Sequence, residues 1–274
     1  MYTLNCKGRL LTFTSPIVMG IINTTPDSFY SGSRTAQDQW LHKAAQMIAE
    51  GATILDIGGQ STRPGSDQVP AEEELKRVIP AIEAIHQRFP EQIISIDTFY
   101  TKVAKEAVAA GASIVNDVSA GSMDESMYET VASLRVPYVL MHMKGHPKNM
   151  QQQPVYENVV TEVFDTLNQN LARLTAMGVH DVIVDPGFGF GKTARHNFQL
   201  LQSLSFFTHL QKPLLAGLSR KATVYKTLGT TAEEALNGTT VLHTIALLNG
   251  ANMLRVHDVK QAMEAIKLVE AYLQ

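Results

Sequence analysis

The sequence holds a single cysteine, Cys6, among 274 residues. One thiol cannot form an internal disulfide, which excludes a disulfide-stapled fold and is typical of a reducing compartment. No segment approaches the ~18 consecutive apolar residues of a membrane-spanning helix, and residues 1–22 lack the continuous apolar core of a signal peptide. We therefore expect a cytoplasmic protein that does not enter a membrane.

A surplus of positive charge is absent as well. Lysine and arginine number 23 against 26 acidic residues, for a net charge of −3, so nothing indicates a nucleic-acid partner. Hydrophobic residues make up 45% and charged residues 18%, which is ordinary for a globular chain. Because no Gly/Ser-rich or Pro-rich linker divides the sequence, we predict one domain over residues 1–274.

Short apolar runs rich in β-branched residues alternate with longer amphipathic patterns. The runs are continuous rather than alternating, as expected of strands that are buried on both faces. They lie at residues 17–22, 53–58, 93–97, 113–118, 138–143, 181–185, 213–217 and 252–256. A helical stripe of Val163, Leu167, Leu171 and Leu174 follows the fifth run, and Gly178 suits the residue just past its end.

Eight strand–helix units in a chain of this length predict an α/β fold of the (β/α)8 TIM-barrel type, whose typical size is ~250 residues. The alternative is a doubly wound open sheet, which more often has six strands and a glycine fingerprint after the first. Here the first strand is followed by "NTTPDS" (23–28) instead. Residues 1–12 are predicted to form a short N-terminal hairpin that closes the bottom of the barrel.

The stretch "VDPGFGFGKT" (184–193) looks like a phosphate-binding loop. Gly191, Lys192 and Thr193 supply the end of the pattern G-x-x-x-x-G-K-[ST]. The first glycine of that pattern falls on Pro186, which has no N–H to offer a phosphate. The glycines also follow G-x-G-x-G rather than the dinucleotide pattern G-x-G-x-x-G. The stretch therefore needs another explanation.

Polar residues stand at the end of every predicted strand. In a TIM barrel the active site is built on the loops that follow the C-terminal ends of the strands. One such residue alone is readily a helix cap or a turn residue. A succession at eight strand ends predicts a polar floor on an apolar core. The residues are Asn23, the 58–66 loop, Asp97, Asn116 with Asp117, His142, Asp185, Ser219 to Lys221, and Arg255 with His257.

A cationic group is predicted near the C-terminus. Arg255 and His257 are two residues apart on the last strand, so their side chains share one face. Arginine is a fixed forked donor suited to phosphate, and histidine adds a second donor. Lys221 lies just beyond the seventh strand, where barrels often bind phosphate.

Asp97, Asn116 and Asp185 form a second group. Their oxygens offer hydrogen-bond acceptors to a flat heterocycle that carries adjacent N–H donors, and a carboxylate can accept two parallel bonds from such an edge. The sequence therefore predicts a ring-binding site beside the cationic group.

A zinc site built from His142, His146, Asp185 and His257 is the competing interpretation. The spacing of His142 and His146 falls in a loop with glycine and proline, so helical ligand geometry is not expected there. Mg²⁺ carried in by a phosphorylated substrate fits better, because it needs only one or two protein oxygens besides substrate and water.

The loops "NTTPDSFYSGSR" (23–34) and "GQSTRPGSD" (59–67) are dense in turn residues. Loops at the mouth of a barrel can fold over a ligand and exclude water. Ordinary surface loops are the alternative. Phe29 among polar residues, and Arg63 beside Pro64, favour contact with a ligand.

Motifs at successive strand ends resemble those of the dihydropteroate synthase family, from about residue 17 to the end of the chain. The matching segments are "GIINTTPDSFYSG", "LDIGGQSTRPGS", "ISIDTF", "IVNDVSAG", "MHMKGHP", "VDPGFGFGKT", "LAGLSRKA" and "NGTTVLHTIALLNGANMLRVHDV". The resemblance implies a TIM barrel that condenses 6-hydroxymethyl-7,8-dihydropterin diphosphate with 4-aminobenzoate. The products are 7,8-dihydropteroate and pyrophosphate, in folate biosynthesis. It also implies Mg²⁺ as cofactor, a homodimer, and a sulfonamide target.

The resemblance implies a role for each matching residue. The pterin would be held by Asp97, Asn116, Met141, Asp185 and Lys221. The diphosphate would be held by Asn23, Arg63, Arg255 and His257, with Asn23 as a ligand of the metal. The aminobenzoate would lie among Phe29, Thr62, Pro64, Phe190 and Lys221. Catalytic roles would fall to Asp97, Lys221, Arg255 and His257.

The same resemblance implies a role for residues 184–193 and a mechanism. The loop would present Asp185 to the pterin and Phe190 to the second substrate. The displacement would be SN1-like, with Arg255, His257 and Mg²⁺ stabilising the departing diphosphate and Asp97 stabilising the pterin cation. The free amine of the aminobenzoate needs no strong base.

Two single residues and one loop depart from the family pattern. Ala222 stands where serine is common, which removes a hydroxyl near the expected aminobenzoate carboxylate. Gln60 stands where glutamate is common, and the first loop reads "SFYSGS" where "SFSDGG" is more usual. None of these changes removes a residue assigned to the pterin or the diphosphate.

The sequence alone leaves three other functions open. A pterin-binding methyltransferase would share the acids but does not need the "STRPG" loop or the "SRK…RVHD" anion group. A silent pterin-binding subunit would have little reason to keep Asn23, Lys221, Arg255 and His257 together. A barrel metallohydrolase predicts tightly bound zinc.

Overall fold

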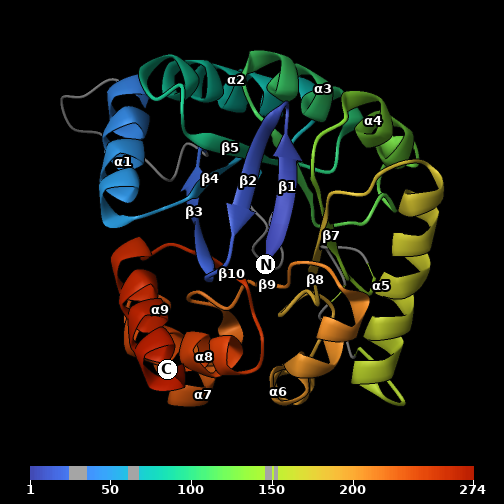
Figure 1. Ribbon diagram of the computed structural model, residues 1–274, viewed down its shortest axis with the longest axis vertical. Helices are drawn as coiled ribbons and strands as arrows, with labels where there is room; N and C mark the ends of the chain where they lie inside the picture. Colours follow the sequence, from blue (N-terminus) through green and yellow to red (C-terminus); the bar gives the residue numbers. More distant parts are fainter. Residues whose placement is uncertain (25–35, 61–67, 146–149, 151–153) are drawn as a thin grey trace.

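Figure 1 shows the computed structural model, which describes residues 1–24, 36–60, 68–145, 150 and 154–274. Eight parallel strands follow one another in the order β8-β7-β6-β5-β4-β3-β10-β9. The sheet closes because Val184 bridges Leu214 in parallel, and the Val184 N–H donates to Pro213 O at 2.9 Å. The (β/α)8 barrel is thus confirmed, and the open doubly wound sheet is excluded.

Each barrel strand lies within a few residues of its predicted run. The strands are β3 (Ile17–Asn23), β4 (Ile54–Gly58), β5 (Ile93–Asp97), β6 (Ile114–Asp117), β7 (Tyr138–Met141), β8 (Val182–Asp185), β9 (Leu215–Ala216) and β10 (Met253–Val256). β9 is shorter than the predicted 213–217. Pro213 has no N–H, and the Leu214 N–H donates to the Asn252 side chain at 3.1 Å, so pairing with β10 begins only at Leu215.

The helices lie outside the barrel in Figure 1. They are α1 (Ala36–Glu50), α2 (Ala71–Arg88), α3 (Thr101–Ala110), α4 (Met127–Leu134), α5 (Val159–Ala176), α6 (Ala194–Gln202), η2 (Leu204–Leu210), α7 (Ala222–Leu228), α8 (Leu236–Leu248) and α9 (Val259–Leu273). In α5 the predicted stripe is buried, and the Asn158 side chain accepts the Val160 N–H at 3.0 Å as N-cap. None of the described helices combines the length and apolar character that a bilayer span requires.

The N-terminal hairpin is confirmed and extends one residue beyond the predicted 1–12. Strands β1 (Tyr2–Cys6) and β2 (Arg9–Phe13) pair antiparallel across a turn whose two central residues, Lys7 and Gly8, have φ of 55° and 88°. The hairpin side chains Leu4, Cys6 and Phe13 pack on inward-facing residues from the first half of the barrel strands. The bottom of the barrel is therefore closed, and the C-terminal strand ends form its mouth.

Candidate active site at the barrel mouth

The two predicted groups of polar side chains meet at the mouth of the barrel. Arg255 donates from Nε to Asp56 Oδ2 at 2.6 Å and from Nη2 to Asp97 Oδ2 at 2.5 Å. Asn116 Nδ2 donates to the same Asp56 oxygen at 3.0 Å. The guanidinium of the cationic group is thus in direct contact with a carboxylate of the ring-binding group.

Asp56 is the main site residue that the sequence prediction missed. It lies in the middle of β4, is fully buried, and its Oδ1 has no hydrogen-bond partner among the described residues. The available signal was a carboxylate inside the apolar run 53–58, since a buried acid needs a partner. That partner, Arg255, is 199 residues away in the sequence.

Burial dominates the electrostatics of this network. It raises the pKa of Asp97 to about 7; the neighbouring Asp56 and Asp117 add to the rise, while Arg255 and Lys221 oppose it. Burial also opposes the charge of Arg255, but Asp56 and Asp97 outweigh it and raise the arginine pKa above its ordinary value. Arg255 is therefore a permanent cation that is paired with the buried carboxyl groups of Asp56 and Asp97.

Asp185 and Lys221 form the other side of the mouth. Asp185 Oδ1 accepts the Gly187 N–H at 2.7 Å. Lys221 Nζ donates to Phe188 O at 2.5 Å and lies 4.7 Å from the centroid of the Phe190 ring. Burial lowers the pKa of Lys221 to about 8, with Arg255 adding to the shift and Asp185 opposing it. An ammonium over an aromatic face suits contact with a flat ligand.

Lys192 explains the phosphate-loop appearance of residues 184–193. Its side chain is 2% exposed, and Nζ donates to Gly187 O at 2.9 Å, to Phe190 O at 3.0 Å and to His142 O at 3.3 Å. Nδ1 of the His142 ring is 2.9 Å from the same ammonium. Burial and Lys192 lower the pKa of His142 to about 2, so this imidazole is neutral. Lys192 therefore stabilises the loop through hydrogen bonds in the interior and is not placed to bind phosphate.

Two glycines of the same loop are required by close backbone approach. Gly187 and Gly191 have φ of 71° and 64°. A Cβ on Gly187 would lie 1.9 Å from His142 O, and one on Gly191 would lie 2.1 Å from Lys144 O. These glycines therefore let the loop pass close to the backbone of His142 and Lys144.

His257 is held by the serine that follows β9. The His257 backbone N–H donates to Ser219 Oγ at 3.2 Å, and the same oxygen is 3.0 Å from Nδ1 of the ring. Burial and the neighbouring Arg255 lower the pKa of His257 to about 4. The imidazole is therefore neutral at neutral pH and can donate one N–H.

Two other predicted strand-end residues have structural partners. Arg220 pairs with Asp258 through Nε at 2.7 Å and Nη2 at 2.9 Å, which ties the loop after β9 to the loop after β10. Asp117 accepts from Ser119 N at 2.7 Å and from the Tyr138 hydroxyl at 2.8 Å. These side chains shape the mouth without being available to a ligand.

An apolar cluster lies beside the polar groups. Met141 and Phe190, both predicted to contact substrates, pack with three residues that sequence analysis did not single out: Phe99, Val118 and Met150. Asn23 is exposed at the end of β3. Phe29, Thr62, Arg63, Pro64 and His146 lie outside the described residues, as do most of the two predicted mouth loops.

The described residues do not support the zinc interpretation. They contain no group of three or more His, Cys, Asp or Glu side chains that could hold a metal ion. Within the predicted set, Nδ1 of His142 faces Lys192 and Nδ1 of His257 faces Ser219. Nothing in this part of the chain corresponds to the site of a barrel metallohydrolase.

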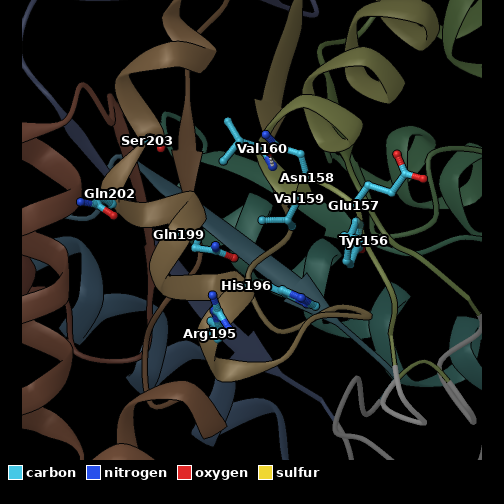
Figure 2. A pocket seen from close by; sticks show the side chains of 10 residues that line it. All are labelled: Tyr156, Glu157, Asn158, Val159, Val160, Arg195, His196, Gln199, Gln202 and Ser203. Atoms are coloured by element: carbon cyan, nitrogen blue, oxygen red, sulfur yellow. Dashed lines mark hydrogen bonds between the residues drawn. The ribbon is translucent and has the colours of Figure 1, made fainter.

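A cavity of about 510 Å³ lies away from these residues, between the start of α5 and α6 (Figure 2). Polar side chains dominate its lining, among them Glu157, Asn158, Arg195 and His196. None of the predicted site residues lines it, so we treat it as separate from the candidate active site.

Comparisons with known proteins agree with the strand-end motifs. The family model described as "Pterin binding enzyme" matches residues 19–257. Dihydropteroate synthase of Escherichia coli K12 is 44% identical over 270 residues, which cover 97% of this chain and 95% of that protein. Two solved structures of Xanthomonas albilineans dihydropteroate synthase also match. One, with 4-aminobenzoic acid, has a TM-score of 0.92 and 42% identity, and covers 99% of this chain and 98% of that one. The other, with 7,8-dihydropteroate, has a TM-score of 0.90 and 40% identity, and covers 99% of both chains. The chain therefore belongs to the dihydropteroate synthase family of pterin-binding enzymes.

Proposed function

We propose that this protein condenses 6-hydroxymethyl-7,8-dihydropterin diphosphate with 4-aminobenzoate to give 7,8-dihydropteroate and pyrophosphate. It is a transferase of folate biosynthesis. The observation that carries the proposal is the contact of Arg255 with both Asp56 and Asp97, because it brings the acceptors for a ring and the donor for an anion into one mouth. A methyltransferase acting on a pterin without a diphosphate would need Arg255 only to compensate Asp56 and Asp97, and would have no ligand for its remaining donors.

The pterin is held by Asp97, Asn116, Asp185 and Lys221, with Met141 beside the ring. The 2-amino and ring N–H groups of a pterin are donors, and Asp97 and Asp185 are buried acceptors at the mouth. In both acids one oxygen already accepts from the protein, which restrains the carboxylate and leaves the other oxygen to accept from the ligand.

The diphosphate is held by Arg255, His257, Asn23 and Arg63. Arg255 uses two of its five N–H groups for Asp56 and Asp97, so its remaining donors serve the phosphate oxygens. Ser219 is hydrogen-bonded to Nδ1 of His257. This leaves Nε2 of the ring to donate to the diphosphate. This arrangement fixes the donors before the leaving group acquires its charge.

Mg²⁺ fits the mouth as a cofactor brought in with the diphosphate. The exposed Asn23 side chain offers the kind of oxygen ligand that Mg²⁺ accepts, and substrate oxygens and water would complete the shell. When bound, the ion supplies Lewis-acid stabilisation of charge on the phosphate oxygens.

The aminobenzoate binds over Phe190, next to Lys221, with Phe29, Thr62 and Pro64 as further contacts. The C–O bond between the pterin methylene and the diphosphate breaks, the amine nitrogen forms the new C–N bond, and the amine loses a proton to solvent. Asp97 stabilises positive charge on the pterin, and Arg255 and His257 stabilise the departing diphosphate. The reaction is SN1-like because charge separates before the amine attacks.

The turnover assay tests this function directly. Purified protein, Mg²⁺ and the pterin diphosphate are incubated with or without 4-aminobenzoate, and dihydropteroate and pyrophosphate are quantified. We expect both products in equal amounts, with dihydropteroate only when the aminobenzoate is present. Pyrophosphate without dihydropteroate would instead indicate a hydrolase.

Ala222 offers a prediction about the second substrate. It opens α7 immediately after Lys221, where a serine hydroxyl could donate to the aminobenzoate carboxylate. Ala222→Ser is expected to lower the KM for 4-aminobenzoate about fivefold, the effect of one hydrogen bond of ~1 kcal/mol. Steady-state kinetics measure it, with the exposed Ala271→Ser as control; an unchanged KM in both variants would remove Ala222 from the aminobenzoate site.

The whole chain acts as one domain in a cytoplasmic homodimer. α8 is apolar on its outer side as well as its inner side: Val241, Ile245 and Leu248 are 51%, 37% and 48% exposed, and Leu228 of α7 is 58% exposed. Such a patch is typical of a surface covered by another chain, here a second copy.

Val241→Glu with Ile245→Glu is expected to yield monomers in light scattering, whereas Leu268→Glu on α9 leaves the dimer intact. A wild-type monomer would contradict the proposal.

A further inference from the structure

Asp56 lies inside the barrel, one layer below the mouth. Residues two apart on a strand share a face, so Ile54, Asp56 and Gly58 of β4 all point inward. Ile54 belongs to the apolar cluster that the N-terminal hairpin closes, and a Cβ built on Gly58 would lie 3.5 Å from Cβ of Asp97. Asp56 is 0% exposed between these two levels, so it lies beneath the residues assigned to the ring and is closed off from the ligand.

A single oxygen of Asp56 accepts from both predicted groups. Oδ2 accepts from Arg255 Nε at 2.6 Å and from Asn116 Nδ2 at 3.0 Å. The strands that carry these donors, β10 and β6, each lie two strands away from β4, on opposite sides of it. Ladder hydrogen bonds join only neighbouring strands. This oxygen therefore connects the diphosphate donor to the ring-binding amide across the interior of the barrel.

The same contact decides which end of the Asn116 amide faces the ligand. A carboxylate only accepts hydrogen bonds, so the NH2 group of Asn116 must be turned toward Asp56. The carbonyl oxygen Oδ1 occupies the other branch of the amide and has no hydrogen-bond partner among the described residues. Asn116 pairs with Asp97 in the register of β5 and β6, so the acceptors of these two residues stand side by side.

We propose that Asp56 is a positioning residue for the reaction: it holds Asn116 with its carbonyl oxygen toward the pterin and Arg255 with its Nη groups toward the diphosphate. The inference rests on the proposed function, which assigns these ligands to Asn116 and Arg255. Asp56 touches neither substrate. Without its acceptor oxygen the Asn116 amide is free to turn over, and Arg255 keeps Asp97 as its partner among the described residues.

Compensation of charge is the alternative role for a buried acid beside an arginine. Asp56→Asn removes the charge but keeps an oxygen that can accept from both donors. Its new NH2 group can donate to Ser95 Oγ, which lies opposite Asp56 in the register of β4 and β5 and has no partner in the part of the chain that the structure describes. Asp56→Leu removes both the charge and the acceptor at similar volume. Asp165→Leu, at an exposed acid of α5, is the matched control.

Calorimetry with 6-hydroxymethyl-7,8-dihydropterin, which lacks the diphosphate, tests the effect on the ring. Asp56→Leu is expected to weaken binding about tenfold, through loss of one hydrogen bond to the ring, and Asp56→Asn no more than about threefold. In an Asn116→Ala background, Asp56→Leu should weaken binding by less than about threefold, because its effect passes through Asn116. Equal weakening by Asp56→Asn and Asp56→Leu would indicate charge compensation and refute the positioning role.

A second test does not depend on the folding of the leucine variant. Asn116→Asp places two carboxylates face to face and is expected to weaken binding of the dihydropterin at least about tenfold. Adding Asp56→Asn restores a donor and an acceptor with their places exchanged, and the carboxylate at position 116 still offers an oxygen to the ring. We expect affinity to return to within about threefold of wild type. Absence of any recovery would contradict the proposal.

Turnover tests the effect on the diphosphate. Asp56→Leu is expected to lower kcat about a hundredfold, because Arg255 no longer meets the leaving group in a fixed position as its charge develops. Asp165→Leu should leave kcat at the wild-type value. A kcat of Asp56→Leu equal to that of wild type would refute the positioning of Arg255.

The outcomes separate the two proposals. If the wild type forms no dihydropteroate, the proposed function fails. Crystal structures of the free wild type and of free Asp56→Leu then still show whether Asn116 and Arg255 move. Unchanged Asn116 and Arg255 side chains in the variant would overturn the positioning role whatever the activity.

Discussion

Arg255→Ala is expected to lower kcat/KM for the pterin diphosphate by about a thousandfold, the upper range for loss of one preorganised donor to developing charge. Arg255 joins Asp56 and Asp97 at 2.6 Å and 2.5 Å and lies where the proposed leaving group departs. Both kcat and kcat/KM should fall, because the interaction strengthens as the C–O bond breaks.

The same substitution leaves Asp56 fully buried with Asn116 as its remaining hydrogen-bond partner among the described residues. A loss of stability could therefore imitate a loss of catalysis. Combining Arg255→Ala with Asp56→Asn removes the uncompensated charge, and we expect this double variant to melt closer to wild type while staying inactive. Arg195→Ala, an exposed arginine of α6, is the matched control and should retain full activity. Activity of the double variant near that of wild type would contradict the role of Arg255.

Lys192→Met is expected to destabilise the protein by about 3 kcal/mol, because the carbonyls of Gly187 and Phe190 each lose a hydrogen-bond donor in the interior. For a chain of this size the melting temperature should fall by roughly 5 °C. Activity should fall as well, since the loop carries Asp185 and Phe190. Thermal melting measures the effect, with the exposed Lys260→Met as control.

A phosphate-binding lysine would behave differently. Lys192→Met would then raise the KM for the pterin diphosphate and leave the melting temperature unchanged. The melting temperature therefore decides whether Lys192 stabilises the loop from inside or contacts the ligand.

The architecture was predictable because buried parallel strands leave a simple signature. Eight apolar runs with polar ends predicted both the barrel and the strand ends at which Asp97, Asn116, Asp185 and Arg255 lie. Parallel strands bring their C-terminal ends to one edge, so sequence order alone placed these side chains in one mouth.

The roles of Asp56 and Lys192 were not predictable in the same way. Asp56 stands inside an apolar run, and the arginine that compensates its charge comes from the last strand. The partners of Lys192 are backbone carbonyls, whose directions follow from the positive φ of the loop glycines and not from residue type. The contributions of Phe29, Thr62, Arg63 and Pro64 stay predictions.

A crystal structure of the protein with Mg²⁺ and the pterin diphosphate tests the central claim most directly. We predict the edge of the ring within about 3 Å of Asp97, Asn116 and Asp185, and the diphosphate on Arg255 and His257. A ring bound in the cavity between α5 and α6, or a diphosphate held by Lys192, would contradict the account.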